Sequence, residues 1–290
     1  MATDFDLALR VLYVLTAPII AGLLTGVDRK LTARMQSRMG PPLLQPFYDL
    51  IKLWGKEPFI TNFIQPTLAF GYLAFTVTGI ALIALQEDLL FILYTVVIGD
   101  VCLAIAAYST KSPYSNLGGK RELLAMLSIE PIMVLTAIGV HLVTGSFQIS
   151  SIFAYPTPLL LILPAALAVQ IIVLVIDMKK SPFDISGSSH AHQSLVRGVY
   201  TEFSGYTQAL VEMGHWLKVY FTLSLIALFW AQNFVIGAAI AFVLFFIAIL
   251  IDNLYPRLDW RDMLKTSWTR SRASCCETPM RRRYRRISGP

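Results

Sequence analysis

Long apolar blocks separated by shorter polar segments dominate the pattern of the chain. Each block is long enough to cross a bilayer as a helix, which takes about 20 residues. We therefore predict an all-α, polytopic membrane bundle of about seven transmembrane helices. The predicted spans are residues 7–27, 65–85, 89–109, 123–144, 157–177, 208–230 and 233–254.

The composition supports a membrane protein. Hydrophobic residues make up 56% of the chain and charged residues 14%, whereas a soluble domain would be nearer half apolar and a quarter charged. Acidic residues, Asp4 and Asp6, precede the first block, so we expect a membrane span there and no cleaved signal peptide. Residues 1–268 are predicted to form one multi-pass domain in the cell membrane.

Basic residues are confined to alternate loops. Of the 24 Lys and Arg residues, 22 lie in the first, third and fifth loops and in the segment after residue 254. The positive-inside rule places these segments in the cytoplasm and the N-terminus outside. The net charge of +6 is explained in this way without a nucleic-acid partner.

The first cytoplasmic loop contains a predicted surface helix. After a break at residues 40–42, apolar residues recur at helical spacing with charged residues on the other faces. This pattern is typical of an amphipathic helix that lies along a membrane surface. Its apolar positions are Leu44, Phe47, Leu50, Ile51 and Trp54.

Ionisable residues inside the spans are the sharpest physical signal. A charge at the centre of a bilayer costs about 2.5–3.5 kcal/mol on insertion scales and tends to mark an ion or proton route. Any one of these residues, His141 and Lys218 in particular, can be a paired structural group, but together they favour a polar path through the bundle. The predicted path comprises Asp100, Glu122, Glu130, His141, Asp177, Glu202, Glu212 and His215.

Two histidines in the fifth loop raise the question of a metal site. His190 and His192 are two residues apart, so on a helix they diverge by about 200°, and no third ligand is spaced nearby. The three cysteines, Cys102, Cys275 and Cys276, show no ligand spacing either. We therefore expect no metal and no cofactor in this chain, and we interpret the loop as a docking surface for a redox subunit.

Four motifs identify a family. In order they are "RMGPPLLQPFYDLIKLWGKE", "NLGGKRELLAMLSIEP", "SPFDISGSSHAHQSLVRGVYTEFSG" and "NLYPRLDWRDML". Over about residues 10–268 they resemble the membrane subunit of respiratory complex I that joins the peripheral arm to the membrane arm, the subunit 1 family.

Within this superfamily the chain is more similar to the homologous subunit of energy-converting, formate hydrogenlyase-like nickel–iron hydrogenases. It runs directly through "RMGPPLLQP", where quinone-reducing relatives carry extra residues, and it contains "HAHQ". The resemblance implies an ion-translocation coupling subunit of a ferredoxin-dependent, hydrogen-evolving complex. Iron–sulfur clusters and a nickel–iron centre would belong to large and small hydrogenase subunits docked on the cytoplasmic loops. Ferredoxin would act indirectly, and the membrane partners would be antiporter-like subunits and lipid.

The resemblance also assigns roles by position. Glu130, Glu202 and Asp184 match acids of the family motifs, and Arg121 matches the arginine that opens the same helix as Glu130. These acids would belong to a buried chain of carboxylates leading to the ion-pumping subunits. The predicted docking residues are Arg34, Arg38, Gln45, Asp49, Lys52, Lys56, Glu57, Arg121, Phe183, Asp184, His190, His192 and Arg197.

The chain departs from the family pattern at two places. Ser194 stands where relatives usually carry an acid, which puts a complete acid chain in doubt. After Trp268 the sequence is basic and has no apolar run, so the family's eighth helix is absent or altered. Residues 269–290 are interpreted as an aberrant gene end, a divergent cytoplasmic tail, or a basic tail that contacts anionic lipid.

Other functions remain open at this point. The same superfamily includes quinone oxidoreductases, in which the loops and the first and sixth spans would form a quinone chamber, although the short first loop argues against this. A stand-alone secondary ion transporter or an inert membrane anchor would also place acids in the membrane. The pattern does not distinguish protons from sodium ions.

Overall fold

The computed structural model describes residues 2–60, 62–183, 198–256 and 262–269. These residues are almost entirely helical, and the only β feature among them is an isolated bridge between Asp88 and Gln148. The helices are α1 (Ala2–Met35), α2 (Gln45–Trp54), α3 (Ile64–Leu85), α4 (Leu89–Tyr108), α5 (Pro113–Thr144), α6 (Ile149–Ala154), α7 (Leu159–Ile162), α8 (Pro164–Asp177), η1 (Gly198–Tyr200), α9 (Gly205–Ala227), η2 (Leu228–Trp230) and α10 (Phe234–Leu254). A short helical stretch at residues 262–269 follows α10 along the chain.

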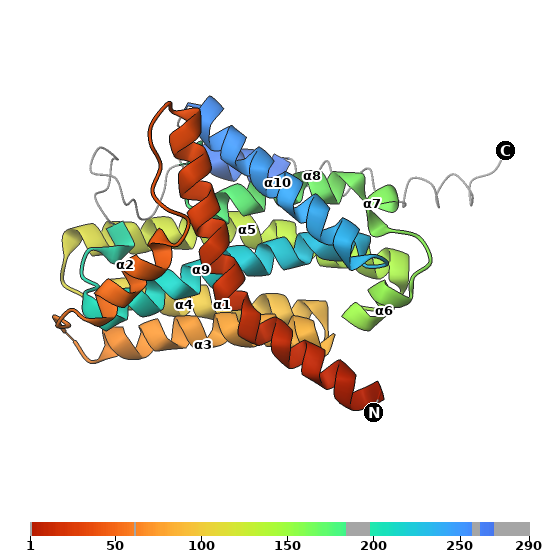
Figure 1. Ribbon diagram of the computed structural model, residues 1–290, viewed down its shortest axis with the longest axis horizontal. Helices are drawn as coiled ribbons and strands as arrows, with labels where there is room; N and C mark the ends of the chain where they lie inside the picture. Colours follow the sequence, from red (N-terminus) through yellow and green to blue (C-terminus); the bar gives the residue numbers. More distant parts are fainter. Residues whose placement is uncertain (1, 61, 184–197, 257–261, 270–290) are drawn as a thin grey trace.

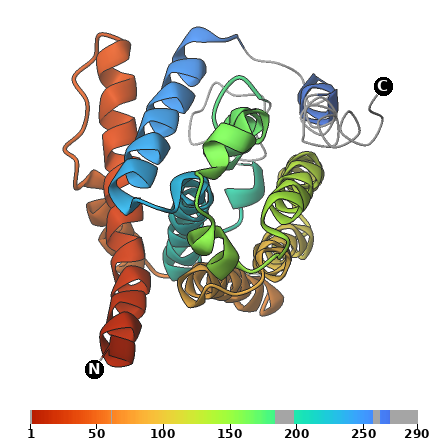
Figure 2. The same ribbon diagram turned by 90° about the vertical axis from the view of Figure 1, so that its right-hand side faces the viewer.

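The long helices form a bundle with α9 near its centre. Helices α3, α4, α5 and α9 run alongside one another, while α1 crosses them steeply and α10 crosses obliquely (Figure 1). Seen along the bundle, α1 and α10 lie on one side and α5 on the opposite side (Figure 2). Helix α9 contacts α1, α2, α3, α8 and α10. Its side chains therefore meet neighbouring helices on several of its faces.

The predicted helical membrane bundle is confirmed, with changes to individual spans. Five helices, α1, α3, α4, α5 and α10, are long and apolar enough to cross a membrane. The predicted fifth span, residues 157–177, is instead divided into α7 and the 14-residue α8. Pro164 opens α8, and the preceding Leu163 has a non-helical backbone (φ −123°, ψ 54°), as expected for a residue before proline.

The predicted fourth span also differs, because α5 begins at Pro113 and not at residue 123. The additional turns contain Gly118, which lets η1 approach closely. A Cβ atom at Gly118 would lie 2.3 Å from the backbone nitrogen of Val199. Small residues thus bring the end of the fifth loop against the start of α5.

The helix predicted in the first loop is present as α2 (Gln45–Trp54), but its apolar stripe is divided. Phe47 and Leu50 pack against the core, whereas Ile51 and Trp54 are 67% and 58% exposed. The Phe47 ring lies 5.9 Å from that of Trp216 on α9 and would clash with a Cβ atom at Gly22 on α1. Phe47 therefore fills the space between α1, α2 and α9.

The outward faces of the bundle are apolar. Leu15 on α1, Phe70 on α3 and Phe242 on α10 are all more than half exposed. Such surface suits lipid or neighbouring membrane subunits. The polar side chains that could carry chemistry lie on the inner faces.

Candidate functional site

Lys218 lies at the centre of a buried charge cluster. Its Nζ donates a hydrogen bond to Oδ2 of Asp100 at 2.8 Å and lies 3.1 Å from Oδ1 of Asp177. Thr222, one turn further along α9, donates to Oδ2 of Asp177 at 2.6 Å. We call Lys218, Asp100, Asp177 and Thr222 the central cluster; it joins α4, α8 and α9.

The position of each residue in its helix explains why the cluster is buried. Asp100 lies in the middle of α4, Asp177 is the last residue of α8, and both are among the buried residues of their helices. The side chains of Lys218, Asp100 and Asp177 are 8%, 7% and 2% exposed. Charges so far from water persist only when they are paired, so the three groups depend on one another.

A second lysine lies where the fifth loop leaves α8. Nζ of Lys179 is 3.1 Å from the Glu122 carboxylate on α5 and donates to the Tyr200 hydroxyl at 2.7 Å. Burial alone would lower the pKa of Lys179, but Glu122 and Tyr200 raise it above its ordinary value. Burial raises the pKa of Tyr200, although the Lys179 ammonium opposes this. Lys179 therefore remains protonated at neutral pH and links α5 to the loop.

A third lysine ties the same loop to the outer helices. Lys180 contacts Asp28 on α1 and lies 3.2 Å from Asp252 on α10. It also donates to Thr32 at 3.3 Å. This contact clamps the loop after α8 to α1 and α10.

Three small cavities follow the inner face of α5. The first, of about 20 Å³, is bordered by all three lysines together with Asp100, Glu122 and Asp177. The second, of about 30 Å³, shares Asp100, Asp177 and Lys218 with the first and extends to Glu130. Cavities of this size hold one or two water molecules when polar groups are present.

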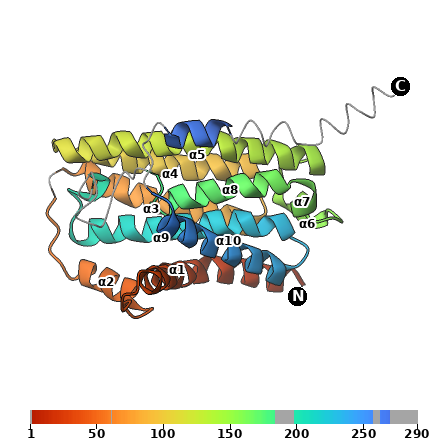
Figure 3. The same ribbon diagram turned by 90° about the horizontal axis from the view of Figure 1, so that it is seen from above.

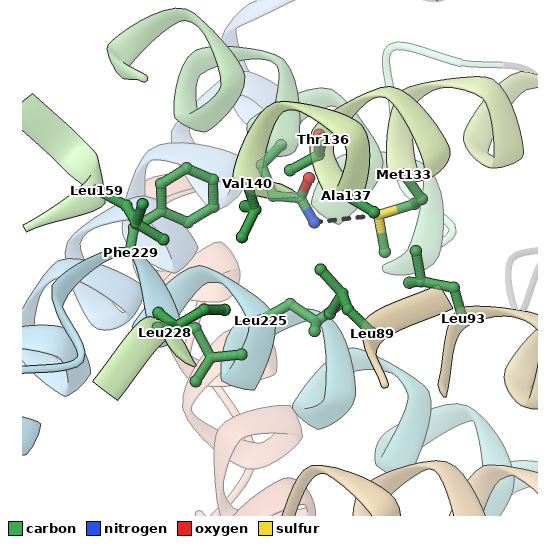
Figure 4. Close-up of a pocket in the computed structure, with 12 residues that line it drawn as sticks. Leu89, Leu93, Met133, Thr136, Ala137, Val140, Leu159, Leu225, Leu228 and Phe229 are labelled. Carbon is green, nitrogen blue, oxygen red and sulfur yellow. Dashed lines mark hydrogen bonds between the residues drawn. The ribbon is translucent and has the colours of Figure 1, made fainter. Parts of the chain in front are cut away.

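The third cavity continues from the second, with which it shares Leu93 and Met133. It is also about 30 Å³ and is lined almost entirely by apolar side chains. Figure 4 shows an amide nitrogen directed at the Met133 sulfur, and this is the 3.2 Å contact from Nε2 of Gln170. The Gln170 carbonyl oxygen is buried without a hydrogen-bond partner. Polar groups therefore become sparse beyond Met133.

The structure brings four of the predicted path residues together. Asp100, Glu122 and Asp177 border the first cavity, and Glu130 borders the second. The sequence pattern, which treats Lys218 as structural when considered alone, does not indicate that it pairs with two of these acids. The one sign of this pairing in the sequence is that Lys218 is a lysine inside a predicted span with no acid partner identified in that span. Asp100 and Asp177 lie 118 and 41 positions away in the sequence, so no local pattern links them to Lys218.

The other predicted path residues lie elsewhere. His141 stacks on Phe147 with ring centroids 4.1 Å apart. Glu212 accepts a hydrogen bond from Trp216 at 3.2 Å and lies 3.8 Å from Arg29 on α1. His215 has a buried Nδ1 without a partner, and half-buried Glu202 lies between η1 and α9. None of these four borders the three cavities.

The predicted docking residues also divide into two groups. Gln45 and Asp49 are engaged inside the chain, since Asp49 accepts from Gln45 at 2.9 Å and from Arg29 at 2.8 Å. Phe183 is 6% exposed and packs in the core, and Arg121 is half-buried. Asp184, His190, His192, Ser194 and Arg197 lie outside the described residues, as do residues 270–290. The exposed members are Arg34, Arg38, Lys52, Lys56 and Glu57.

Comparisons with known proteins agree on one family. The sequence profile of the family described as NADH dehydrogenase matches residues 8–273. Formate hydrogenlyase subunit 4 of Escherichia coli is 27% identical over 279 residues, which cover 83% of this chain and 90% of that protein. The matching NADH-quinone oxidoreductase subunit of Carboxydothermus hydrogenoformans is 30% identical over 240 residues, 75% of this chain and 63% of that protein.

The fold is shared with a solved membrane complex. A chain of an archaeal respiratory complex, the membrane-bound sulfane sulfur reductase, superposes with a TM-score of 0.81 at 23% identity. The match covers 95% of this chain and 99% of the other. At this identity the likeness concerns the fold alone.

Proposed function

The chain belongs to the NADH dehydrogenase family and is a membrane subunit of a complex I-like or energy-converting hydrogenase complex. From this premise we propose that it couples a docked redox module to ion-translocating subunits in a ferredoxin-dependent, hydrogen-evolving hydrogenase. The observation that carries the proposal is the central cluster, which lies inside the bundle between two cavities bordered by further acids.

Three features favour a hydrogenase over a quinone oxidoreductase. Formate hydrogenlyase subunit 4 is matched over 90% of its length, and the first loop is short, as in that branch. In addition, Phe47 fills the space between α1, α2 and α9, where the alternative function requires a quinone chamber. In this proposal the iron–sulfur clusters and the nickel–iron centre belong to large and small subunits on the cytoplasmic loops.

The coupling proceeds through the lysines. Reduction of the docked module changes the charge near the segment that holds Tyr200 and Lys179. One added charge about 4 Å from a partly buried group changes its energy by about 4 kcal/mol, enough to alter the pairing of Lys179 with Glu122. Protons or other ions then redistribute over the central cluster and Glu130, toward antiporter-like subunits.

The acceptor is tested on the purified complex. We expect it to oxidise reduced ferredoxin, evolve hydrogen and copurify with subunits that carry iron–sulfur clusters. A complex that reduces quinone and makes no hydrogen would instead support the quinone-chamber function. The 30% identity to a quinone oxidoreductase subunit is the observation that favours this alternative. Ion movement by the isolated chain in liposomes would support a stand-alone transporter.

The coupling role is tested in inverted membrane vesicles. Glu130→Gln should abolish most ferredoxin-driven ion uptake while hydrogen evolution continues, because the second cavity loses the acid that lies outside the central cluster. The matched control is Glu87→Gln, an exposed glutamate between α3 and α4, which should leave uptake unchanged. Normal uptake in Glu130→Gln would refute the coupling path.

A further inference from the structure

The central cluster contains more negative than positive charge. Asp100 and Asp177 bring two carboxylates to a single ammonium group, that of Lys218. If all three are ionised, the cluster carries one uncompensated negative charge. Such a charge is very unfavourable in a site this deeply buried.

Among the residues that the structure describes, no neighbouring group supplies the missing positive charge. On α5, Glu122 is matched by Lys179, and Glu130 adds a further carboxylate beside the second cavity. Lys180 borders the first cavity, but Asp28 and Asp252 already hold it. The remaining titratable neighbours are Tyr72 on α3 and His215 on α9.

Two buried carboxylate oxygens of the central cluster also lack a hydrogen-bond donor among the described residues. Oδ1 of Asp100 and Oδ1 of Asp177 accept no hydrogen bond from the described part of the chain, although the latter lies 3.1 Å from Nζ of Lys218. A carboxylate oxygen left without a donor in a buried site is unfavourable. One added proton would balance the charge and convert one of these two oxygens into a hydroxyl group, which is itself a donor.

We propose that the central cluster holds one exchangeable proton, shared by Asp100 and Asp177 while Lys218 remains charged between them. Binding breaks one O–H bond of a hydronium ion that reaches the adjoining cavity, leaves a water molecule there, and forms one O–H bond on a carboxylate oxygen. Release returns the proton to a cavity and leaves the cluster with its extra negative charge. The inference deepens the proposed coupling function, since it identifies the ion handled at this point as a proton.

A sodium ion does not fit the same position. The Nζ atom lies 2.8 Å from one carboxylate and 3.1 Å from the other, so the ammonium group already occupies the place of a shared cation. A sodium ion that contacted both carboxylates would be forced close to this positive charge. A proton bonds to one carboxylate oxygen and forms a neutral carboxylic acid, so it places no second positive ion beside the ammonium group.

The test is infrared spectroscopy of the purified complex in water and in D₂O. The wild type should show the C=O stretch of a buried, protonated carboxylic acid that shifts on deuteration. Asp100→Asn should lose this band, because one carboxylate and one ammonium group remain and balance each other. Asp177→Asn gives the same test if Asp100→Asn does not assemble. The matched control is Asp252→Asn, which removes an aspartate from a different lysine and should retain the band.

A sodium titration at constant pH completes the test. The band should be unchanged by added sodium, and its disappearance would show that sodium displaces the proton and would overturn the inference. A band that persists in both Asp100→Asn and Asp177→Asn would overturn it as well. If the wild type lacks the band but Asp100→Asn loses ion uptake, the stored proton is refuted and the coupling role is retained. If the bands are as expected but Glu130→Gln takes up ions normally, the coupling path is refuted and the stored proton is retained.

Discussion

Removal of the Lys218 ammonium group should strongly destabilise the subunit. Lys218→Met keeps most of the side-chain volume but leaves Asp100 and Asp177 buried without a cation. At about 3 Å and an effective dielectric constant of about 20, each contact contributes roughly 5 kcal/mol before desolvation. Measured losses for breaking a buried pair are about 3–5 kcal/mol, which corresponds to a melting temperature roughly 6–15 °C lower for a chain of this size.

The assay is the fraction of assembled complex that survives heating, measured by size-exclusion chromatography. Lys30→Met, which removes an exposed lysine of α1, is the control and should change the melting temperature little. Combining Lys218→Met with Asp100→Asn and Asp177→Asn should recover most of the loss, because replacing a whole buried ion cluster by neutral groups is often close to neutral. A melting temperature of Lys218→Met equal to that of the wild type would refute the reasoning.

Three other substitutions test neighbouring parts of the site. Gly118→Ala should lower the melting temperature by the equivalent of about 1–3 kcal/mol, since its Cβ atom would meet the backbone of η1; an unchanged melting curve would contradict this packing. Gln170→Leu should be neutral or stabilising, because it removes a buried carbonyl oxygen that has no partner; a clear loss of stability would show that this oxygen is satisfied by water. Glu122→Gln should lower the melting temperature by a constant amount from neutral pH to about 10, and by less at higher pH. The reason is that Glu122 raises the pKa of Lys179 in the folded protein. This stabilises the wild type fully below the ordinary lysine pKa, and the stabilisation is lost as the pH rises through the raised pKa. A difference that does not shrink above the ordinary lysine pKa would mean that the Lys179 charge is not its source.

The sequence predicts the helices better than it predicts their breaks. The apolar blocks identify α1, α3, α4 and α10 because hydropathy alone determines these spans. The break before α8 depends on the proline at residue 164, which lies within an otherwise continuous apolar run. The early start of α5 depends on tertiary packing of Gly118 against η1, which no local pattern encodes.

The site was predictable only in its separate parts. Asp100, Glu130 and Asp177 are visible as acids inside or at the ends of spans. Their grouping around Lys218 depends on how α4, α8 and α9 pack, as seen from above in Figure 3. Glu212 lies with Arg29 on a different face of α9, because the six positions that separate it from Lys218 rotate it by about 240° around the helix.

The ratio of ions taken up to electrons transferred tests the central claim most directly. Asp177→Asn is the suitable variant, since an asparagine can still accept the hydrogen bond from Thr222 while the carboxylate charge is lost. In inverted vesicles we expect hydrogen evolution to continue and the ion-to-electron ratio to fall close to zero. An unchanged ratio in a fully assembled Asp177→Asn complex would contradict the claim that the central cluster carries the coupling.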